Sequence, residues 1–211
     1  MSLYIPPSFA SGDLAVLARL VGEHPFATLI TTGEGEPRVS HLPLLHVADP
    51  EPHGTLIGHM ARANPHWRHF AEGRTLAIFH GPHAYVSPSW YAAPATQVPT
   101  WNYAVAHVHG HAELVDRDAT LATLQAMIER FEGSRREPWR LQLEGDRLDA
   151  MVGAIVAFRI AIERVDVKLK LSQNKDPEDV KRVARALRGE DLADADATAA
   201  WMERLGNQAG A

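Results

Sequence analysis

The chain has 211 residues, of which 45% are hydrophobic and 22% are charged, and its formal net charge at pH 7 is −5. This length allows one large domain, and the negative charge argues against a surface built mainly to hold nucleic acid or anionic lipid. The absence of cysteine excludes disulfides, cysteine-ligated metal sites and cysteine nucleophiles, and it suits a cytoplasmic location. The sequence shows no signal-peptide pattern and no apolar run near the roughly 20 residues of a membrane span.

The first part of the chain predicts one helix followed by several strands. Ser11 can cap a helix that runs from about Gly12 to Gly22. We expect Leu14, Leu17 and Val21 on its buried face. Alternating apolar patterns then predict strands at residues 26–32, 38–47, 55–60 and 74–81, and the turn GEGEP joins the first two as a hairpin.

Two segments among these strands look like functional connections. Residues 61–70 predict a strand-to-helix turn, in which Pro65 suits the first helical turn. Residues 82–103 are rich in proline and aromatic residues, and they predict a short strand followed by a long ordered loop. Loops of this length inside compact domains are usually functional.

A long strand at residues 103–115 and a helix at residues 116–133 follow. The apolar spacing of the helix predicts a buried stripe, and Gly133 stands where a C-terminal cap belongs. The stripe consists of Leu121, Leu124, Ile128 and Phe131.

The last part of the chain predicts one long strand and two helices. Residues 154–171 form the strand, and its inward parity changes near Arg164, as a bend at a barrel corner would require. Asp176 and Pro177 begin the first helix, which ends at Gly189. The second helix runs from about Ala195 to Leu205. The sum is an α+β pattern, an antiparallel barrel with helices packed outside it.

All twelve histidines lie between His24 and His111, so we expect the polar site in the first half of the chain. His107, His109 and His111 share one face of their strand, while the small residues of the other parity pack inward. Such a strand can bind zinc if a third ligand is available, yet no spacing compels one. The alternative is a polar outer face or subunit interface. The possible third ligands are His41, His83 and Glu113.

Two further segments carry candidate binding residues. In GHMARANPHW, Arg62 lies beside the backbone amides of a helix that begins near Asn64, which suits a phosphate; an ordinary helix cap is the alternative. In VPTWNY, Trp101 and Tyr103 share a parity on either side of Asn102, which suits a flat ring system; loop packing is the alternative.

The segment KLKLSQNK places Lys168, Lys170 and Ser172 on the expected outer face of a strand end. Gln173, Asn174 and Lys175 follow, and the group can donate hydrogen bonds to an anion or a ring carbonyl. A solvated strand end is the alternative. Together these segments supply a phosphate site, aromatic walls and polar donors, which is what flavin mononucleotide (FMN) requires.

Six blocks of sequence occur in a recognisable order: YIPPSF, HLPLL, GHMARANPHW, GPHAYVSPSWY, VPTWNY with its HVHG, and KLSQNK. With these blocks, the chain resembles the PaiB-type family of FMN-binding negative transcriptional regulators, and the resemblance covers nearly the whole chain, from Tyr4 to about Leu187. The resemblance implies an antiparallel split β-barrel of the flavin-reductase and pyridoxamine-phosphate-oxidase type with flanking helices. We expect an FMN-binding domain at residues 1–175, a helical extension packed on it at 176–211, and a homodimer with FMN between its subunits.

The resemblance also implies a set of cofactor-binding residues. By analogy with split barrels, the strand-to-helix segment would hold the phosphate, an inner strand would edge the flavin ring, and aromatic residues would reach it from the partner subunit. The three groups are Met60, Arg62 and Asn64; Ser40, His41 and Leu42; and Trp101, Asn102 and Tyr103, with Lys170, Gln173 and Lys175 as further donors.

Three functions follow from these observations. The first is an FMN-binding regulator, for which we expect no strong direct DNA binding, because residues 176–205 carry five basic and eight acidic side chains. The second is an FMN-dependent oxidoreductase of a small molecule; only the histidines offer a general acid or base, so no catalytic residue is assigned. The third is a histidine-ligated metal or haem protein.

Overall fold

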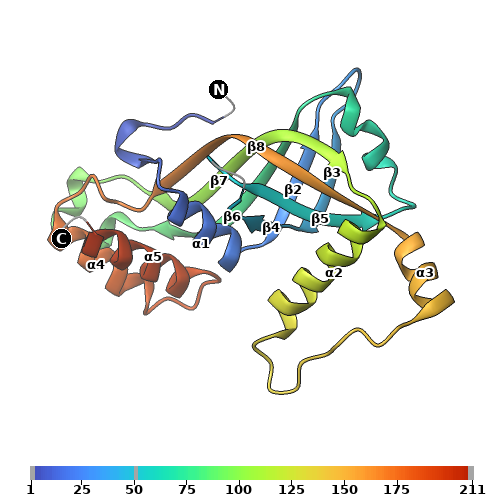
Figure 1. Ribbon diagram of the computed structural model, residues 1–211. Helices are drawn as coiled ribbons and strands as arrows, with labels where there is room; N and C mark the ends of the chain where they lie inside the picture. The colour runs from blue at the N-terminus through green and yellow to red at the C-terminus, as the bar shows by residue number, and fades with distance from the viewer. Residues whose placement is uncertain (1–2, 50–51, 209–211) are drawn as a thin grey trace. The chain divides into compact units, whose positions relative to one another are not determined.

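The computed structural model describes residues 3–49 and 52–208 (Figure 1). The chain forms two compact units. Unit 1 consists of Met1–Leu20, His80–His107 and Asp166–Ala211, and unit 2 consists of Val21–Phe79 and Val108–Val165. In the described part of the chain, no helix is long and apolar enough to cross a membrane.

Eight strands form one antiparallel sheet, in the order β3-β2-β6-β7-β8-β5-β4, with β1 paired to β8. The long strands β6, β7 and β8 each contribute residues to both units. The strands are β1 (Ala10–Ser11), β2 (Phe26–Thr31), β3 (Arg38–Pro43), β4 (Leu45–Val47), β5 (Thr55–Ala61), β6 (Thr75–Val86), β7 (Thr100–Leu114) and β8 (Ile155–Lys170).

Helices of two kinds connect these strands. The α-helices are α1 (Leu14–Glu23), α2 (Arg117–Glu132), α3 (Gly145–Gly153), α4 (Pro177–Leu187) and α5 (Ala195–Gln208). The short 3-10 helices are η1 (Pro7–Phe9), η2 (Pro65–Glu72), η3 (Pro88–Trp90) and η4 (Pro94–Thr96). The segment 133–144 between α2 and α3 contains no helix or strand (Figure 1).

Unit 2 is organised around the β2–β3 hairpin, in which Thr31 pairs with Arg38 at the turn. Phe70 of η2 packs edge-on against Phe158 of β8, with ring centroids 5.0 Å apart. Burial of each such side chain contributes about 1.5–3 kcal/mol, so η2 is held firmly against the strands. The other buried side chains of this core include Leu29, Leu42, Leu56, Phe79 and Ile160.

Unit 1 has a separate core between its helices and its strand segments. Ala104 and Ala106 of β7 and Leu17 and Leu20 of α1 are buried, and a Cβ atom at Gly81 of β6 would lie 2.5 Å from the side chain of Leu20 and 3.0 Å from that of Ala104. Helices α4 and α5 lie side by side (Figure 1), and an ion pair of 2.7 Å between Arg188 and Glu203 joins them. Their buried side chains are Val183, Ala184, Leu187, Thr198, Ala199, Trp201 and Met202.

Several predictions about the elements are confirmed. The hairpin, the third strand and the two C-terminal helices occur where the sequence places them, and Asp176 caps α4 by accepting the N–H of Glu178 at 2.9 Å. The parity change in β8 is also present. Phe158 and Ile160 are buried on one parity, Val167 and Leu169 on the other, and Arg164 between them is exposed.

Other predictions about the helices are wrong in detail. Asp13 caps α1 instead of Ser11, because its carboxylate accepts the N–H of Ala15 at 2.8 Å. Leu14 is exposed, whereas Val16 is buried. The buried stripe of α2 is rotated by one residue from the predicted one: Thr120, Thr123 and Met127 are buried, the predicted Leu121, Leu124 and Ile128 are half-buried, and Phe131 is exposed.

Two further features differ from the expected chain path. Strand β6 continues through Pro82 to Val86, so the predicted loop is shorter and contains the turns η3 and η4. Helix α3 was not predicted, because its nine residues carry too short a pattern to separate a helix from a loop.

Gly110 of β7 offers a test of the strand packing in unit 2. A Cβ atom at this position would overlap the carbonyl oxygen of Ala161, which is backbone and cannot turn aside. We expect Gly110→Ala to lower the free energy of unfolding by about 1–3 kcal/mol, as measured by urea denaturation. Gly22→Ala is the control, since nothing lies within 4 Å of its Cβ position. Equal stability of the two variants would contradict this packing.

Candidate functional site

The turn after β5 contains a side chain that organises its surroundings. Asn64 caps η2, and its side-chain oxygen accepts the N–H of His66 at 3.0 Å. Its amide nitrogen donates to the hydroxyl of Ser40 at 2.9 Å. Two residues that the sequence assigns to the cofactor, Ser40 and Asn64, are therefore in direct contact.

A buried chain of hydrogen bonds continues from Ser40. Its hydroxyl oxygen lies 2.8 Å from Nδ1 of His66, and Nε2 of His66 lies 3.0 Å from the hydroxyl of Thr31. Thr31 in turn lies 3.0 Å from the hydroxyl of Thr75. A neutral imidazole donates from one ring nitrogen and accepts at the other, so His66 satisfies both hydroxyl groups in either tautomer.

His66 is neutral in this arrangement. Its pKa is lowered from 6.5 to about 4, mainly by burial and to a smaller extent by electrostatic repulsion from His69 and Arg38. A neutral imidazole with both nitrogens committed fixes the orientation of Ser40. The sequence analysis did not identify His66, Thr31 or Thr75; the only local signal is the histidine that follows Asn64 and Pro65.

Arg62 has a different environment from the one predicted. Its Nε donates to the carbonyl of Gly153 at 2.6 Å and its Nη2 to the carbonyl of Ile155 at 2.8 Å. The guanidinium thus ties the end of β5 to the junction of α3 and β8. A guanidinium has five N–H donors, so donors remain for an anion. Arg62 also lines a cavity of about 440 Å³ together with Asp116, Arg117 and residues of α3 and β8.

The inner-strand residues point in alternate directions. Ser40 and Leu42 are buried, whereas His41 is exposed and stacks on Phe26 with centroids 6.5 Å apart. Met60 is buried on β5. The structure therefore brings together Ser40 and Asn64 and places His41 on the opposite face of β3.

The aromatic residues of the TWNY segment belong to unit 1. Trp101 is 53% exposed, and its ring lies 6.2 Å from that of His83 and 6.3 Å from that of Tyr85. Asn102 is buried, and its amide donates to the hydroxyl of Ser172 at 3.0 Å. Tyr103 is half-buried, with the ammonium of Lys168 5.3 Å from its ring centroid. An exposed aromatic group next to buried polar atoms suits a flat ligand.

The KLSQNK segment differs from its predicted outward face. Lys168 and Ser172 are buried, because the lysine donates to the carbonyl of Tyr4 at 2.9 Å and the serine pairs with Asn102. The side chain of Gln173 bonds to the backbone just before it: it accepts the N–H of Leu171 at 2.8 Å and donates to the carbonyl of Leu169. Lys170 and Lys175 both line a small cavity of about 220 Å³.

The histidine strand forms polar pairs. His109 is buried, against expectation, and its Nε2 accepts from the guanidinium of Arg164 at 2.9 Å. His111 lies 2.8 Å from the carboxylate of Glu163, and this hydrogen bond is the main cause that lowers the pKa of Glu163. In the residues that the structure describes, no group of three histidine or acidic side chains is arranged to hold a metal ion.

The donor set fits an FMN. In unit 2, hydroxyl and amide groups at Ser40 and Asn64 are held by a neutral histidine, and a guanidinium with remaining donors lies at Arg62. In unit 1, taken by itself, Trp101 offers an exposed ring. A phosphate, a polar ring edge and a flat ring system need these three kinds of group.

The buried His66 predicts a dependence of stability on pH. Its folded pKa of about 4 lies below 6.5, so the unfolded state binds more protons between these values. The contribution of neutral His66 to the free energy of unfolding is about 3 kcal/mol. It is fully present above pH 6.5 and is lost as the pH falls to about 4. We expect the free energy of unfolding of His66→Gln, obtained from denaturation curves at several pH values, to fall less steeply with decreasing pH in this window than that of the wild type. His80→Gln, a substitution at an exposed position, should fall as steeply as the wild type. An unchanged slope in His66→Gln would contradict the assignment.

Comparison with known proteins gives the family. Residues 3–164 match the family described as "Putative FMN-binding domain". The Bacillus subtilis (strain 168) protein named "Protease synthase and sporulation protein PAI 2" is 36% identical over 204 residues, which cover 95% of this chain and 97% of that protein.

Solved structures show the fold. The FAD and heme binding protein from Mycobacterium smegmatis has a TM-score of 0.61 at 21% identity, over 82% of this chain and 78% of that chain. The flavocytochrome Anf3 from Azotobacter vinelandii has a TM-score of 0.61 at 16% identity, over 82% of this chain and 75% of that chain. The predicted α+β split barrel with flanking helices is confirmed. The chain belongs to the FMN-binding domain family that residues 3–164 match, it is a homologue of the Bacillus subtilis PAI 2 protein, and its cofactor is FMN.

Proposed function

We propose that Ser40, Asn64 and Arg62 form the centre of the FMN site. The observation that carries this proposal is the direct hydrogen bond between Asn64 and Ser40, fixed from behind by the neutral His66. A binding group whose orientation is set before the ligand arrives loses little conformational entropy on binding. Arg62 would hold the phosphate, and Leu42 and Met60 would lie along the flavin on the side of Ser40, whereas His41 faces away from it on β3.

We also propose that the chain acts as a homodimer, with Trp101, Asn102 and Tyr103 reaching the flavin of the partner subunit. The exposed aromatic group of Trp101, His83 and Tyr85 supports this, because such groups on a surface commonly mark an interaction site. We also propose Lys170, Gln173 and Lys175 as donors beside Trp101 at the edge of the flavin, where the two lysines keep N–H donors for a second molecule. Residues 1–175 would form the FMN-binding domain and 176–211 its helical extension.

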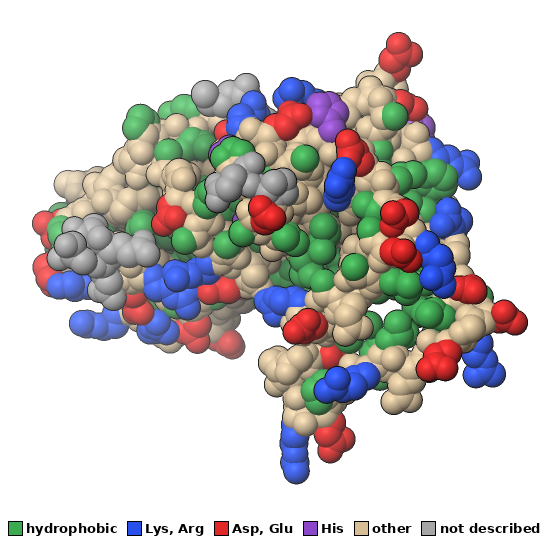
Figure 2. Space-filling model, in the orientation of Figure 1, with side chains coloured by type: hydrophobic (Ala, Val, Ile, Leu, Met, Phe, Trp, Pro, Cys, Tyr) green, Lys and Arg blue, Asp and Glu red, His purple; other side chains and the backbone are tan. Residues whose placement is uncertain are grey.

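The biological role that we propose is negative regulation of gene expression in the cytoplasm. The support is the Bacillus subtilis relative, whose name refers to protease synthesis and sporulation. Direct DNA contact by the C-terminal segment is disfavoured, because acidic side chains outnumber basic ones, eight to five, in residues 176–205. On the face shown in Figure 2, acidic and basic side chains are interspersed and do not form a uniform basic surface.

A flavin-dependent oxidoreductase is the second candidate. When bound, the flavin supplies hydride transfer. The hydrogen-bond chain from Thr75 through His66 to Ser40 favours this candidate, since it can hold a proton at the Ser40 hydroxyl. Turnover of NADH or NADPH by the FMN-loaded protein supports it, and bleaching of flavin absorbance near 450 nm is the readout. For the metal or haem alternative, the structure offers His109 and His111 already bonded to Arg164 and Glu163.

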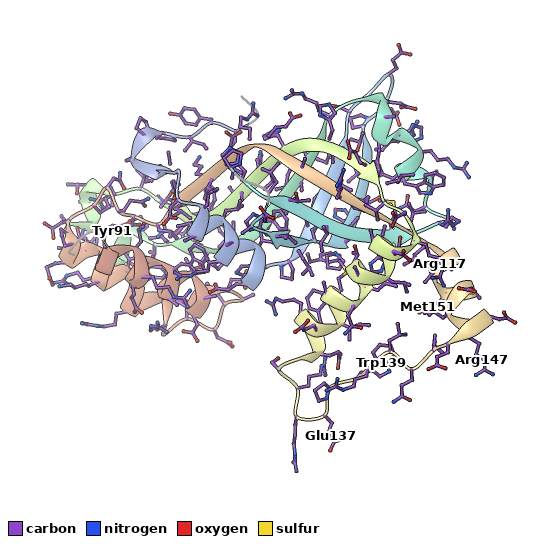
Figure 3. The ribbon with its side chains drawn as sticks, viewed as in Figure 1. Tyr91, Arg117, Glu137, Trp139, Arg147 and Met151 are labelled. Carbon is purple, nitrogen blue, oxygen red and sulfur yellow. The ribbon has the colours of Figure 1, made fainter. Side chains whose placement is uncertain are left out.

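Arg62→Ala tests the phosphate assignment. We expect the affinity for FMN to fall at least tenfold, about 1.4 kcal/mol, while the affinity for riboflavin, which has no phosphate, stays the same. Fluorescence titration gives both affinities, and circular dichroism checks the fold. Arg117→Ala is the matched control, because Arg117 lines the same cavity but pairs with Asp149 (Figure 3). An equal loss for both flavins would show that Arg62 acts only on the fold.

The acidic helix pair predicts the outcome of a DNA-binding assay. We expect the purified protein to give no sequence-specific complex with DNA at low salt, because its helices lack the positive charge that phosphate contact requires. A gel-shift assay with the promoter region of neighbouring genes is the measurement. A tight complex that survives competitor DNA would overturn this part of the proposal.

A further inference from the structure

Three lysines gather at the end of β8 in unit 1 without a negative partner. Lys168 donates to the carbonyl of Tyr4, Lys170 to the carbonyl of Trp101 and the hydroxyl of Thr100, and Lys175 to the side-chain oxygen of Gln97. All of these acceptors are neutral. In the described part of the chain, none of the three ammonium groups forms an ion pair with a carboxylate.

Their positive charges act on one another. The pKa of Lys170 is lowered, first by burial and then by repulsion from Lys168 and Lys175. Neutral acceptors satisfy hydrogen bonds but leave this repulsion in place. By contrast, Lys181 pairs with Glu178 at 2.7 Å, and Arg188 pairs with Glu203. The three lysines have neutral acceptors instead, and an anion would relieve the repulsion between them.

Lys170 and Lys175 also share a cavity of about 220 Å³ with Asn174 and Tyr91. The ammonium of Lys175 lies 5.7 Å from the ring centroid of Tyr91, which Figure 3 shows beside α4. An ammonium group has three N–H donors. Lys170 uses two of them and Lys175 uses one in the bonds described above, so donors remain on both. The volume lies below the roughly 300–1,000 Å³ of sites for drug-sized molecules, so it suits a compact group.

We propose that this cavity binds the phosphate group of a small molecule other than the flavin, held between Lys170 and Lys175. Lys170 bonds to the carbonyl of Trp101, and Asn102 lines the cavity, so the anion would lie next to the aromatic wall assigned to the flavin. The role of that molecule as a substrate or effector beside FMN rests on the proposed function. The binding of phosphate itself does not.

Inorganic phosphate is the probe. We titrate the full chain with phosphate at constant ionic strength, balanced with chloride, and follow tryptophan fluorescence and the midpoint of thermal unfolding. A ligand that binds only the folded state raises this midpoint in a saturable way. We expect saturation in the wild type and at least a tenfold weaker affinity in Lys170→Met and Lys175→Met. Lys181→Met, which removes a lysine with its own partner, should match the wild type.

Three results would overturn the proposal. The first is a wild-type response that does not saturate, and the second is equal binding by the Lys175→Met variant. The third is competition between phosphate and FMN but not riboflavin, which would make the cavity the site of the flavin's own phosphate.

Unchanged phosphate affinity in the FMN-saturated protein supports a second molecule. If Lys170→Met does not fold, Lys170→Arg should fold and retain binding. If the protein binds phosphate but no FMN, the proposed flavin site is refuted and the proposed phosphate site is not.

Discussion

The hydrogen-bond chain through His66 is the interaction on which unit 2 and its proposed site depend. It joins Thr75 of β6, Thr31 of β2 and Ser40 of β3, and it ends at Asn64, which begins η2. Its hydroxyl and imidazole groups are buried and have partners, and Asn64 is half-buried, so the removal of one buried group leaves others unsatisfied at a cost of about 1–3 kcal/mol each. The chain therefore sets both the packing of three strands and the direction of the two groups that we assign to FMN.

The two proposed sites use polar groups in different ways. Around Ser40 in unit 2, neutral hydroxyl, amide and imidazole groups satisfy one another, and their geometry is fixed without charge. In unit 1, Lys170 and Lys175 meet only neutral acceptors, and their charge is left to act on a ligand. The first arrangement suits recognition by shape and hydrogen bonds, and the second suits attraction of an anion. A flavoprotein that handles a second, phosphorylated molecule needs both.

Local patterns predicted much of the fold, and long-range contacts account for what they missed. Strand alternation placed the hairpin and the bend of β8 near Arg164, and Asp176 marked the start of α4. The stripe of α2 was wrong, because Thr120 and Thr123 bond their hydroxyls to carbonyls one turn earlier and so can be buried in place of leucine. Ser40 and Asn64 were predicted as site residues. His66 was not, since its partners lie 26 and 35 residues away and no local spacing reveals them.

Removal of the Ser40 hydroxyl tests the central claim most directly. Ser40→Ala deletes one oxygen atom, removes the hydrogen bonds that this oxygen makes to the Asn64 amide and to Nδ1 of His66, and leaves the hydrophobic core intact. The measurement is an equilibrium titration of the purified protein with FMN, followed by flavin fluorescence, with Ser89→Ala in η3 as the control. We expect saturable binding by the wild type and the control, and at least tenfold weaker binding by Ser40→Ala. Equal affinity in all three proteins would contradict the account.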